Sequence, residues 1–223
     1  MLEVTDALRK ALPGAAMGIL VMRRAGNPAG HPEVAERIEQ LEGELRGRFA
    51  DRNALRALPA MAAYEAYYKR FRKTYHVLLQ LESVALKGKP IPRAGALVEA
   101  MFMAELKSLL LTAGHDLEAI RGPLRLDVAR GGERYVVLNG QEQQLKPGDM
   151  MVADADGVIS CVVYGPDRRT RITPQTRDVL YAVYAPPGIP EDAVRQHLQD
   201  LQANVRLAAP AAQVEVLNVY GTG

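Results

Sequence analysis

The sequence predicts an α+β domain whose core is a curved β-sheet or barrel flanked by helices. In the first half of the chain, apolar residues recur at three- and four-residue steps, which is the period of amphipathic helices. After Gly114, short runs of β-favouring residues alternate with turn sequences such as Asn139-Gly140 and Pro147-Gly148. The 223 residues are enough to bury a core, and we expect one domain over residues 1–223.

The first half is expected to contain one strand and three helices. The strand covers residues 16–23, and the first helix covers 32–48 because its aliphatic residues share one face. A long second helix is expected over 61–86, since its apolar residues form a core-facing stripe. A break at 88–92 separates it from a third helix over 96–111. The stripe of the second helix consists of Met61, Tyr64, Tyr68, Phe71, Tyr75 and Leu78.

Strands dominate the sequence after Gly114. Pro190, followed by two acidic residues, begins a last helix that runs to about Leu207. Residues 213–220 are typical of a closing strand. The six strands expected before that helix cover residues 124–129, 133–138, 150–153, 158–164, 169–173 and 179–184.

Composition places the chain among ordinary globular proteins, with 48% hydrophobic and 24% charged residues. No apolar run reaches the roughly 18 residues that a membrane span needs. The first six residues carry acids and do not resemble a signal peptide. With Cys161 as the single cysteine, no intrachain disulfide can form. We therefore expect a cytoplasmic protein with no membrane partner.

The distribution of charge is more informative than the net charge of +2. The segment from Tyr64 to Arg93 holds seven basic residues against two acidic ones. A local excess of this kind attracts a polyanion, although a solvated helix face is an equal alternative. The basic residues are Lys69, Arg70, Arg72, Lys73, Lys87, Lys89 and Arg93.

Familiar catalytic motifs are absent from the sequence. It contains no phosphate-binding loop, no dinucleotide fingerprint and no nucleophile elbow. The four histidines (His31, His76, His115 and His197) lack the spacing of metal ligands. Cys161 lies inside an apolar run and is expected to be a buried structural thiol. The residues alone thus predict a soluble α+β domain with one basic segment and no cofactor.

Short phrases between residues 62 and 185 occur in the order and spacing of one known family. They are Glu65 to Phe71, Lys87 to Pro92, Leu97-Val98-Glu99, Asp116, Gly132-Glu133, Leu138-Asn139-Gly140, Tyr164-Gly165, and Thr173 with Thr176. On these phrases the chain resembles the editing domain of the bacterial phenylalanyl-tRNA synthetase beta subunit, the B3/B4 domain, and its free-standing relatives. The resemblance covers somewhat over half of the chain.

This resemblance implies hydrolysis of the ester bond that joins a wrong amino acid to the 3′ end of tRNA. A free-standing member would act in trans on released, mischarged tRNA. Because an aminoacyl ester is already activated, a positioned water and a stabilised oxyanion suffice without a catalytic triad. The terminal hydroxyl of the tRNA could assist. The expected partner is therefore tRNA, and no DNA is expected.

The candidate site residues fall into three groups. The expected catalytic residues are His115, Asp116 and Glu133. The expected substrate-binding residues are Glu99, Phe102, Glu105, Asn139, Gly140, Tyr164 and Gly165. The expected tRNA-binding residues are Lys69, Arg72, Lys73, Lys87, Lys89 and Arg93. Structural alternatives stay open, because His115-Asp116 could cap a helix end and Asn139-Gly140 could be only a hairpin turn.

Two positions depart from the synthetase pattern. In an ungapped alignment from Glu99 to Asp116, the asparagine that follows V-V-D-x-x becomes Phe102. The histidine of the H-x-F-D phrase becomes Ala113. The specificity of the synthetase for tyrosine is therefore not carried over to this chain.

Glu105 is expected on an apolar face of the third helix, within about 60° of Val98 and Leu109. A buried carboxylate needs a cation or several hydrogen bonds. The partner is either a lysine or arginine of the core, or a cationic ligand. In the second case Glu99, Glu105 and Asp116 line an acidic pocket, and the discarded amino acid is cationic or polar, such as an arginine analogue.

The sequence is compatible with three functions. The first is a trans-editing aminoacyl-tRNA deacylase. The second is a non-catalytic module that binds tRNA or an amino acid on the same fold. The third is a small-molecule hydrolase with no nucleic-acid partner, which the basic segment disfavours.

Overall fold

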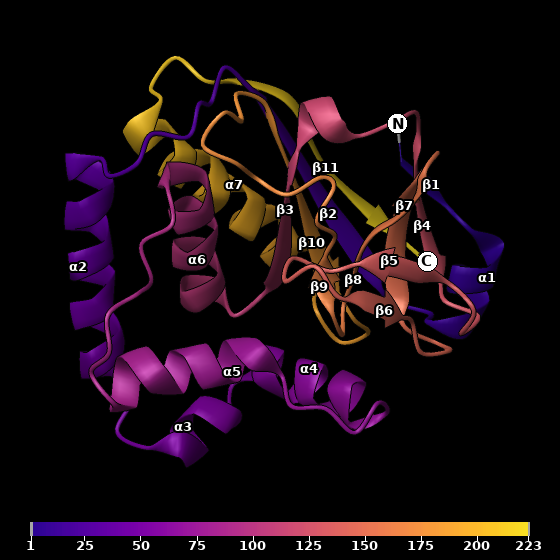
Figure 1. Cartoon of the computed structure of the whole chain (residues 1–223). Helices are drawn as coiled ribbons and strands as arrows, with labels where there is room; N and C mark the ends of the chain where they lie inside the picture. The colour runs from indigo at the N-terminus through magenta and orange to yellow at the C-terminus, as the bar shows by residue number, and fades with distance from the viewer. Residues whose placement is uncertain (1, 223) are drawn as a thin grey trace.

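A computed structural model describes residues 2–222 and confirms an α+β architecture (Figure 1). Its strands form a four-stranded, a five-stranded and a two-stranded sheet. Within residues 2–222 none of the three sheets closes on itself, so the core is built from open sheets rather than a barrel. No helix in this part of the chain is long and apolar enough to cross a membrane.

The four-stranded sheet has the order β11-β2-β10-β3, and all its neighbours are antiparallel. Helices α6 and α7 lie on one side of it, and strands of the second sheet lie on the other (Figure 1). Gly18 permits the close packing of α7, because a Cβ there would lie 2.6 Å from a methyl carbon of Val194. The elements are β2 (Ala16–Arg23), β3 (Leu111–Asp116), β10 (Val179–Ala185), β11 (Gln213–Gly221), α6 (Ala96–Ser108) and α7 (Glu191–Ala208).

The five-stranded sheet has the order β1-β4-β7-β8-β9 and the two-stranded sheet is the hairpin β5-β6. A hydrogen bond between the hydroxyls of Ser160 on β8 and Tyr184 on β10 joins the two larger sheets. The elements are β1 (Leu2–Val4), β4 (Leu124–Val128), β5 (Arg134–Val136), β6 (Glu142–Gln144), β7 (Met150–Asp154), β8 (Gly157–Cys161) and β9 (Gly165–Pro166).

The strand expected over 169–173 is wrong, since this segment forms only an isolated bridge between Arg171 and His115. The reason is local. The carboxylate of Asp167 accepts hydrogen bonds from the backbone N–H and the hydroxyl of Thr170, which closes a turn in place of a strand.

The single long helix expected over 61–86 is also wrong, because the chain breaks after Lys69. Arg72 adopts a left-handed φ of 55°, and the N–H of Lys73 bonds the carbonyl of Tyr68 at 3.2 Å, as at a helix C-terminus. The predicted apolar stripe is nevertheless buried. The segments are α4 (Pro59–Lys69), α5 (His76–Leu81) and the π-helix η1 (Glu82–Leu86). The other helices before α6 are α1 (Asp6–Ala11), α2 (Pro32–Arg48) and α3 (Arg52–Arg56).

The third predicted helix ends three residues early, and this moves two candidate catalytic residues. Leu109 terminates α6 with a left-handed φ of 66°, and residues 111–116 form β3. His115 and Asp116 therefore lie at the end of a strand rather than at the end of a helix. Asp116 caps the short 3-10 helix η2 (Leu117–Ala119) that follows.

Candidate functional site

Three of the predicted tRNA-binding residues line one surface groove of about 490 Å³ between α3, α4 and α5. We call it the Lys69–Lys73 groove. Lys69, Arg72 and Lys73 are exposed and form no ion pair with any residue between 2 and 222. In contrast, Arg56 in the same groove pairs with Glu65 at 2.7 Å. Three cations are thus left without a neutralising partner.

The groove adjoins a second basic hollow of about 440 Å³, and Arg72 lines both. Arg70 stacks its guanidinium 5.4 Å from the ring of Phe71, and Lys146 donates to the carbonyl of Phe71 at 2.9 Å. Arg70 and Lys146 are not among the tRNA-binding residues expected from the sequence. The break after α4 brings these side chains beside Arg72, so no periodicity could have signalled the cluster.

Tyr164 connects the Lys69–Lys73 groove with the second sheet, because Lys73 Nζ lies 5.6 Å from the centre of its ring. Gly165 follows with a left-handed φ of 79°, and its carbonyl accepts the hydroxyl of Tyr135 at 2.8 Å. Asn139 and Gly140 form a tight turn, in which Asn139 Oδ1 accepts the N–H of Gln141 at 2.9 Å. Of the predicted substrate-binding residues, Tyr164 therefore lies beside the basic surface.

The other predicted tRNA-binding residues lie elsewhere. Lys89 and Phe102 line a cavity of about 260 Å³ whose other walls are mainly apolar. The guanidinium of Arg93 lies 3.7 Å from the carboxylate of Glu99. Lys87 is exposed directly after η1.

Glu99 and Glu105 are buried, as the helical stripe predicted for Glu105, and within residues 2–222 no hydrogen bond or ion pair links either of them to Asp116. Glu99 accepts the N–H of Ala94 at 3.1 Å and is 2% exposed. Glu105 accepts the N–H of Thr112 at 2.7 Å, and burial raises its pKa to about 8. Glu105 is therefore mostly neutral near pH 7 and pairs with no lysine or arginine of the described chain. Glu105 therefore offers little negative charge to a cationic substrate at this pH.

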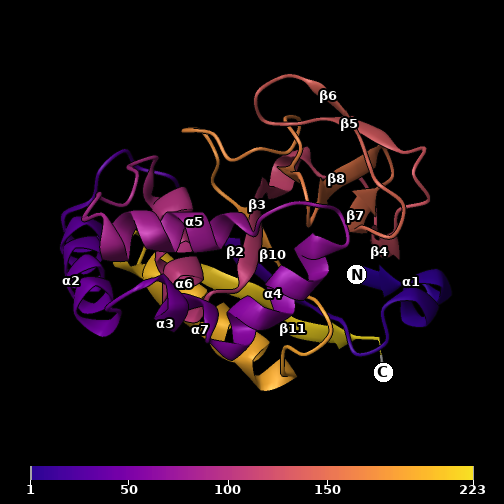
Figure 2. The ribbon, with the colours of Figure 1, turned by 90° about the horizontal axis from the view of Figure 1, so that it is seen from below.

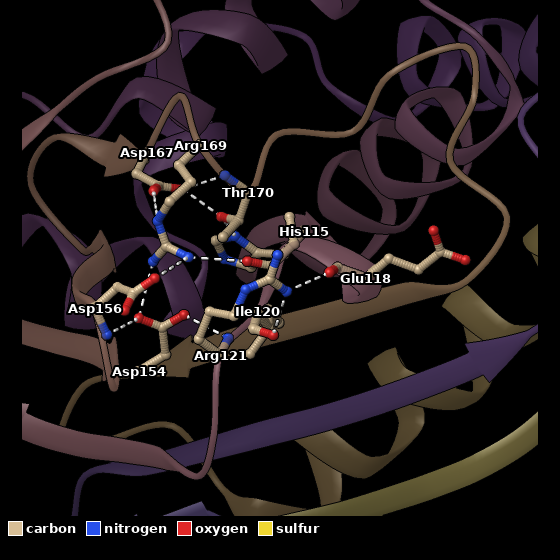
Figure 3. Close-up of polar contacts among 10 residues, drawn as sticks. His115, Glu118, Ile120, Arg121, Asp154, Asp156, Asp167, Arg169 and Thr170 are labelled. Atoms are coloured by element: carbon tan, nitrogen blue, oxygen red, sulfur yellow. Dashed lines mark hydrogen bonds and ion pairs between the residues drawn. The ribbon is translucent and has the colours of Figure 1, made fainter.

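His115 lies fully buried on β3 and is held by the 167–170 turn (Figure 3). Since the Thr170 hydroxyl donates to Asp167, it accepts from His115 Nδ1, which lies 2.7 Å away. Burial, and then the nearby charge of Arg169, lower the pKa of His115 to about 3. The imidazole is thus neutral at physiological pH and has no exposed surface.

Arg169 ties this turn to the β7-β8 hairpin (Figure 3). Its guanidinium bonds Asp154 at 2.8 Å and lies 3.7 Å from Asp167 and 3.9 Å from Asp156. It also donates to the carbonyl of Ala119 at 2.9 Å. Arg169 therefore fixes the segment that positions His115.

The carboxylates of Asp116 and Glu133 are both occupied by local contacts. Asp116 accepts the N–H of Glu118 at 3.0 Å and the hydroxyl of Thr176 at 2.6 Å. Glu133 accepts the N–H groups of residues 130, 131 and 132 at 2.9–3.1 Å. Burial opposes ionisation of Glu133, but these bonds hold its pKa below the usual range. No bond between described residues joins Glu133 to His115 or Asp116.

Replacing Glu133 by alanine is expected to lower the free energy of unfolding by about 1 kcal/mol. The loss stays small because water can solvate the exposed amides that Glu133 now binds. Urea denaturation measures it, with Glu39→Ala on an exposed face of α2 as the control. A loss of activity without loss of stability would contradict this structural role.

The chain is similar in sequence and in structure to phenylalanyl-tRNA synthetase beta subunits from different organisms. The profile of the family described as "B3/4 domain" matches residues 67–207. The phenylalanine–tRNA ligase beta subunit of Mycoplasma pneumoniae is 28% identical over 116 residues, which is 47% of this chain and 14% of the subunit. That of Mycoplasma genitalium is 32% identical over 69 residues, which is 31% of this chain and 9% of the subunit.

A similar solved structure shows the same fold. It is an N-terminal fragment of the phenylalanyl-tRNA synthetase beta subunit from Pyrococcus horikoshii, with a TM-score of 0.50 and 13% sequence identity. The match covers 96% of this chain and 50% of the fragment. The chain thus spans a small part of the curated relatives and about half of the solved one.

Proposed function

Because the chain belongs to the B3/4 domain family, we propose that it binds tRNA and hydrolyses the ester of mischarged aminoacyl-tRNA in trans. The observation that carries this proposal is the Lys69–Lys73 groove. Three unpaired cations from one turn line it, and a partly exposed tyrosine ring adjoins it. Phosphates of an acceptor stem would meet the cations, and an unpaired base could stack on Tyr164.

The proposed hydrolysis depends on positioning rather than on a strong base. His115 has no exposed surface, and the carboxylates of Asp116 and Glu133 already accept backbone or hydroxyl hydrogen bonds. We assign these three residues the task of holding the end of β3 and the 130–132 turn. An aminoacyl ester needs only an oriented water, a stabilised oxyanion and its own neighbouring hydroxyl.

A non-catalytic tRNA-binding module is the second candidate. The observation that favours it is that each of the three candidate catalytic side chains already holds at least one hydrogen bond within the fold. This candidate uses the same Lys69–Lys73 groove. The two functions therefore differ in the rate of ester hydrolysis and agree in the binding of tRNA.

Changing Lys69, Arg72 and Lys73 together to glutamine is expected to weaken tRNA binding by at least tenfold at low salt. Each lost phosphate contact also lowers the slope of log affinity against log salt by about 0.7–0.9, so the triple variant should lose up to about 2.7 units of slope. Fluorescence anisotropy over a salt titration measures both quantities.

The matched control for that variant removes three other exposed cations, Lys10, Arg195 and Arg206, which lie on α1 and α7. It changes the net charge equally and should retain most of the affinity. Equal losses in the two triple variants would mean that tRNA responds to net charge alone, and the groove would then lose its assignment.

A further inference from the structure

The cavity of about 260 Å³ that Lys89 and Phe102 line lies between the α5–η1 segment and α6. In both views of the chain α5 lies beside α6 (Figure 1, Figure 2). Tyr75 and Leu78, at the start of α5, line the Lys69–Lys73 groove, whereas Gln80 and residues of η1 line this cavity. The two hollows share no lining residue. We call this one the Lys89 cavity.

The walls of the Lys89 cavity are mainly apolar. Phe102 and Leu106 are four residues apart on α6 and therefore share one face of the helix. Val84 of η1 and Ile91 of the loop before α6 add further apolar wall. An apolar body that enters this cavity leaves water, which is favourable by about 25 cal/mol per Å² of buried surface.

Hydrogen bonds fix the loop that forms one side of the cavity. The N–H of Lys89 donates to the carbonyl of Ser83 at 3.0 Å, and the N–H of Ile91 donates to the carboxylate of Glu42 at 2.8 Å. The adjoining wall, η1, is a π-helix, which is a rare element found mostly at functional sites. The cavity is thus preformed, so a ligand would not have to order the loop in order to bind.

Three polar side chains of the lining have no partner within residues 2–222. The ammonium of Lys89, the amide of Gln80 and the hydroxyl of Ser83 form no hydrogen bond or ion pair there. No acidic residue of the described chain lines the cavity. The neighbouring acid, Glu82, is paired with Arg52. The charge that this lining carries is therefore positive and has no counter-ion in the fold.

These features are complementary to a ligand with an apolar body and one anionic head. A carboxylate accepts hydrogen bonds from an ammonium, an amide and a hydroxyl alike. An amino acid or an aminoacyl ester fits less well, because its α-ammonium would meet Lys89 and no acid. The volume of about 260 Å³ corresponds to roughly nine water-sized groups, which suits an acid of about six carbons.

We propose that the Lys89 cavity binds a small monocarboxylic acid, with the carboxylate on Lys89 and the apolar body between η1 and α6. The inference goes beyond the binding and deacylation of tRNA and does not depend on either. It assigns Lys89 and Phe102 to one site, whereas the sequence placed them in two different groups.

Titration with two small probes tests the proposal on the full chain. The probes are hexanoate and its neutral analogue hexanamide, and amide chemical shifts in NMR spectra of the isotope-labelled chain report where each one binds. Hexanoate should cause saturable shifts at the amides of Ser83, Lys89 and Phe102. Lys89→Gln should weaken hexanoate by about three- to tenfold and leave hexanamide unchanged, because only the charged head gains a charge-assisted hydrogen bond.

Lys87→Gln is the matched control, because Lys87 is an exposed cation that does not line the cavity. This variant should bind both probes like the unmodified chain. Ser83→Phe should block both probes by filling the cavity, and the same spectra show whether the variant is folded.

The absence of saturable shifts at the cavity amides with hexanoate would overturn the proposal. Equal weakening of hexanoate and hexanamide by Lys89→Gln would overturn the carboxylate contact, as would equal weakening of hexanoate by Lys87→Gln and Lys89→Gln. Hexanoate binding in a chain that releases no amino acid from tRNA would retain this site and reject the deacylase, so the two proposals fail separately.

Discussion

Acidification from about pH 6.5 to about pH 3 is expected to remove on the order of 3–5 kcal/mol of stability for each of His115 and His197. Both are fully buried, and burial lowers the pKa of each to about 3. His197 is bonded through both ring nitrogens, to Ser108 at 2.6 Å and to Thr112 at 2.8 Å. At acidic pH the unfolded chain therefore binds protons at these two sites and the folded chain does not. As a result, the free energy of unfolding decreases as the pH is lowered.

Urea denaturation between pH 7 and pH 3.5 measures this effect. Glu105 acts in the opposite direction between about pH 4.5 and pH 8, so each histidine variant is compared with the unmodified chain at the same pH. We expect the free energies of unfolding of His115→Gln and His197→Gln to approach that of the unmodified chain as the pH falls. Parallel curves for the variants and the unmodified chain would show that the histidines are not buried in the neutral form.

Glu105→Gln is expected to stabilise the chain by on the order of 3–5 kcal/mol at pH 9 and to have little effect at pH 4. The folded pKa of about 8 lies above the ordinary value of 4.5, so the folded state holds this proton more tightly. The stability that the protonated group contributes is complete below pH 4.5 and is lost as the pH rises through 8. Glutamine stays neutral and can still accept the N–H of Thr112.

Thermal and urea denaturation at pH 4, 7 and 9 test this second expectation, with Glu39→Gln as a control for the loss of one exposed charge. A constant difference between Glu105→Gln and the unmodified chain would mean that Glu105 is ionised across the range. The same variant should leave the amino-acid preference of the chain unchanged, because a neutral buried carboxyl attracts no cationic substrate.

The sequence predicted elements well where one periodic pattern matches one element. Strand β2, helix α2 and helix α7 begin and end within about a residue of the expected positions. It failed at Arg72 and Leu109, where non-glycine residues adopt left-handed conformations and end a helix inside an apolar pattern. Both residues lack the glycine that normally marks such an end, so local signals pointed to a continuing helix.

The candidate site was predictable where the residues are close in sequence. Lys69, Arg72 and Lys73 share one turn of chain, and the structure brings them to one groove. The partner of His115 was missed, because Thr170, which Asp167 holds in place, reaches it from a turn more than fifty residues away.

The most direct test of the central claim is deacylation of a panel of mischarged tRNAs by the purified chain at micromolar concentration or below. The panel contains tyrosine on phenylalanine tRNA and basic analogues on arginine tRNA, with correctly charged tRNAs as controls. We expect selective release of the amino acid from at least one mischarged species, and a loss of this release in the Lys69, Arg72 and Lys73 variant. Release no faster than spontaneous hydrolysis from every species, in a chain that still binds tRNA, would contradict the deacylase and leave a binding module.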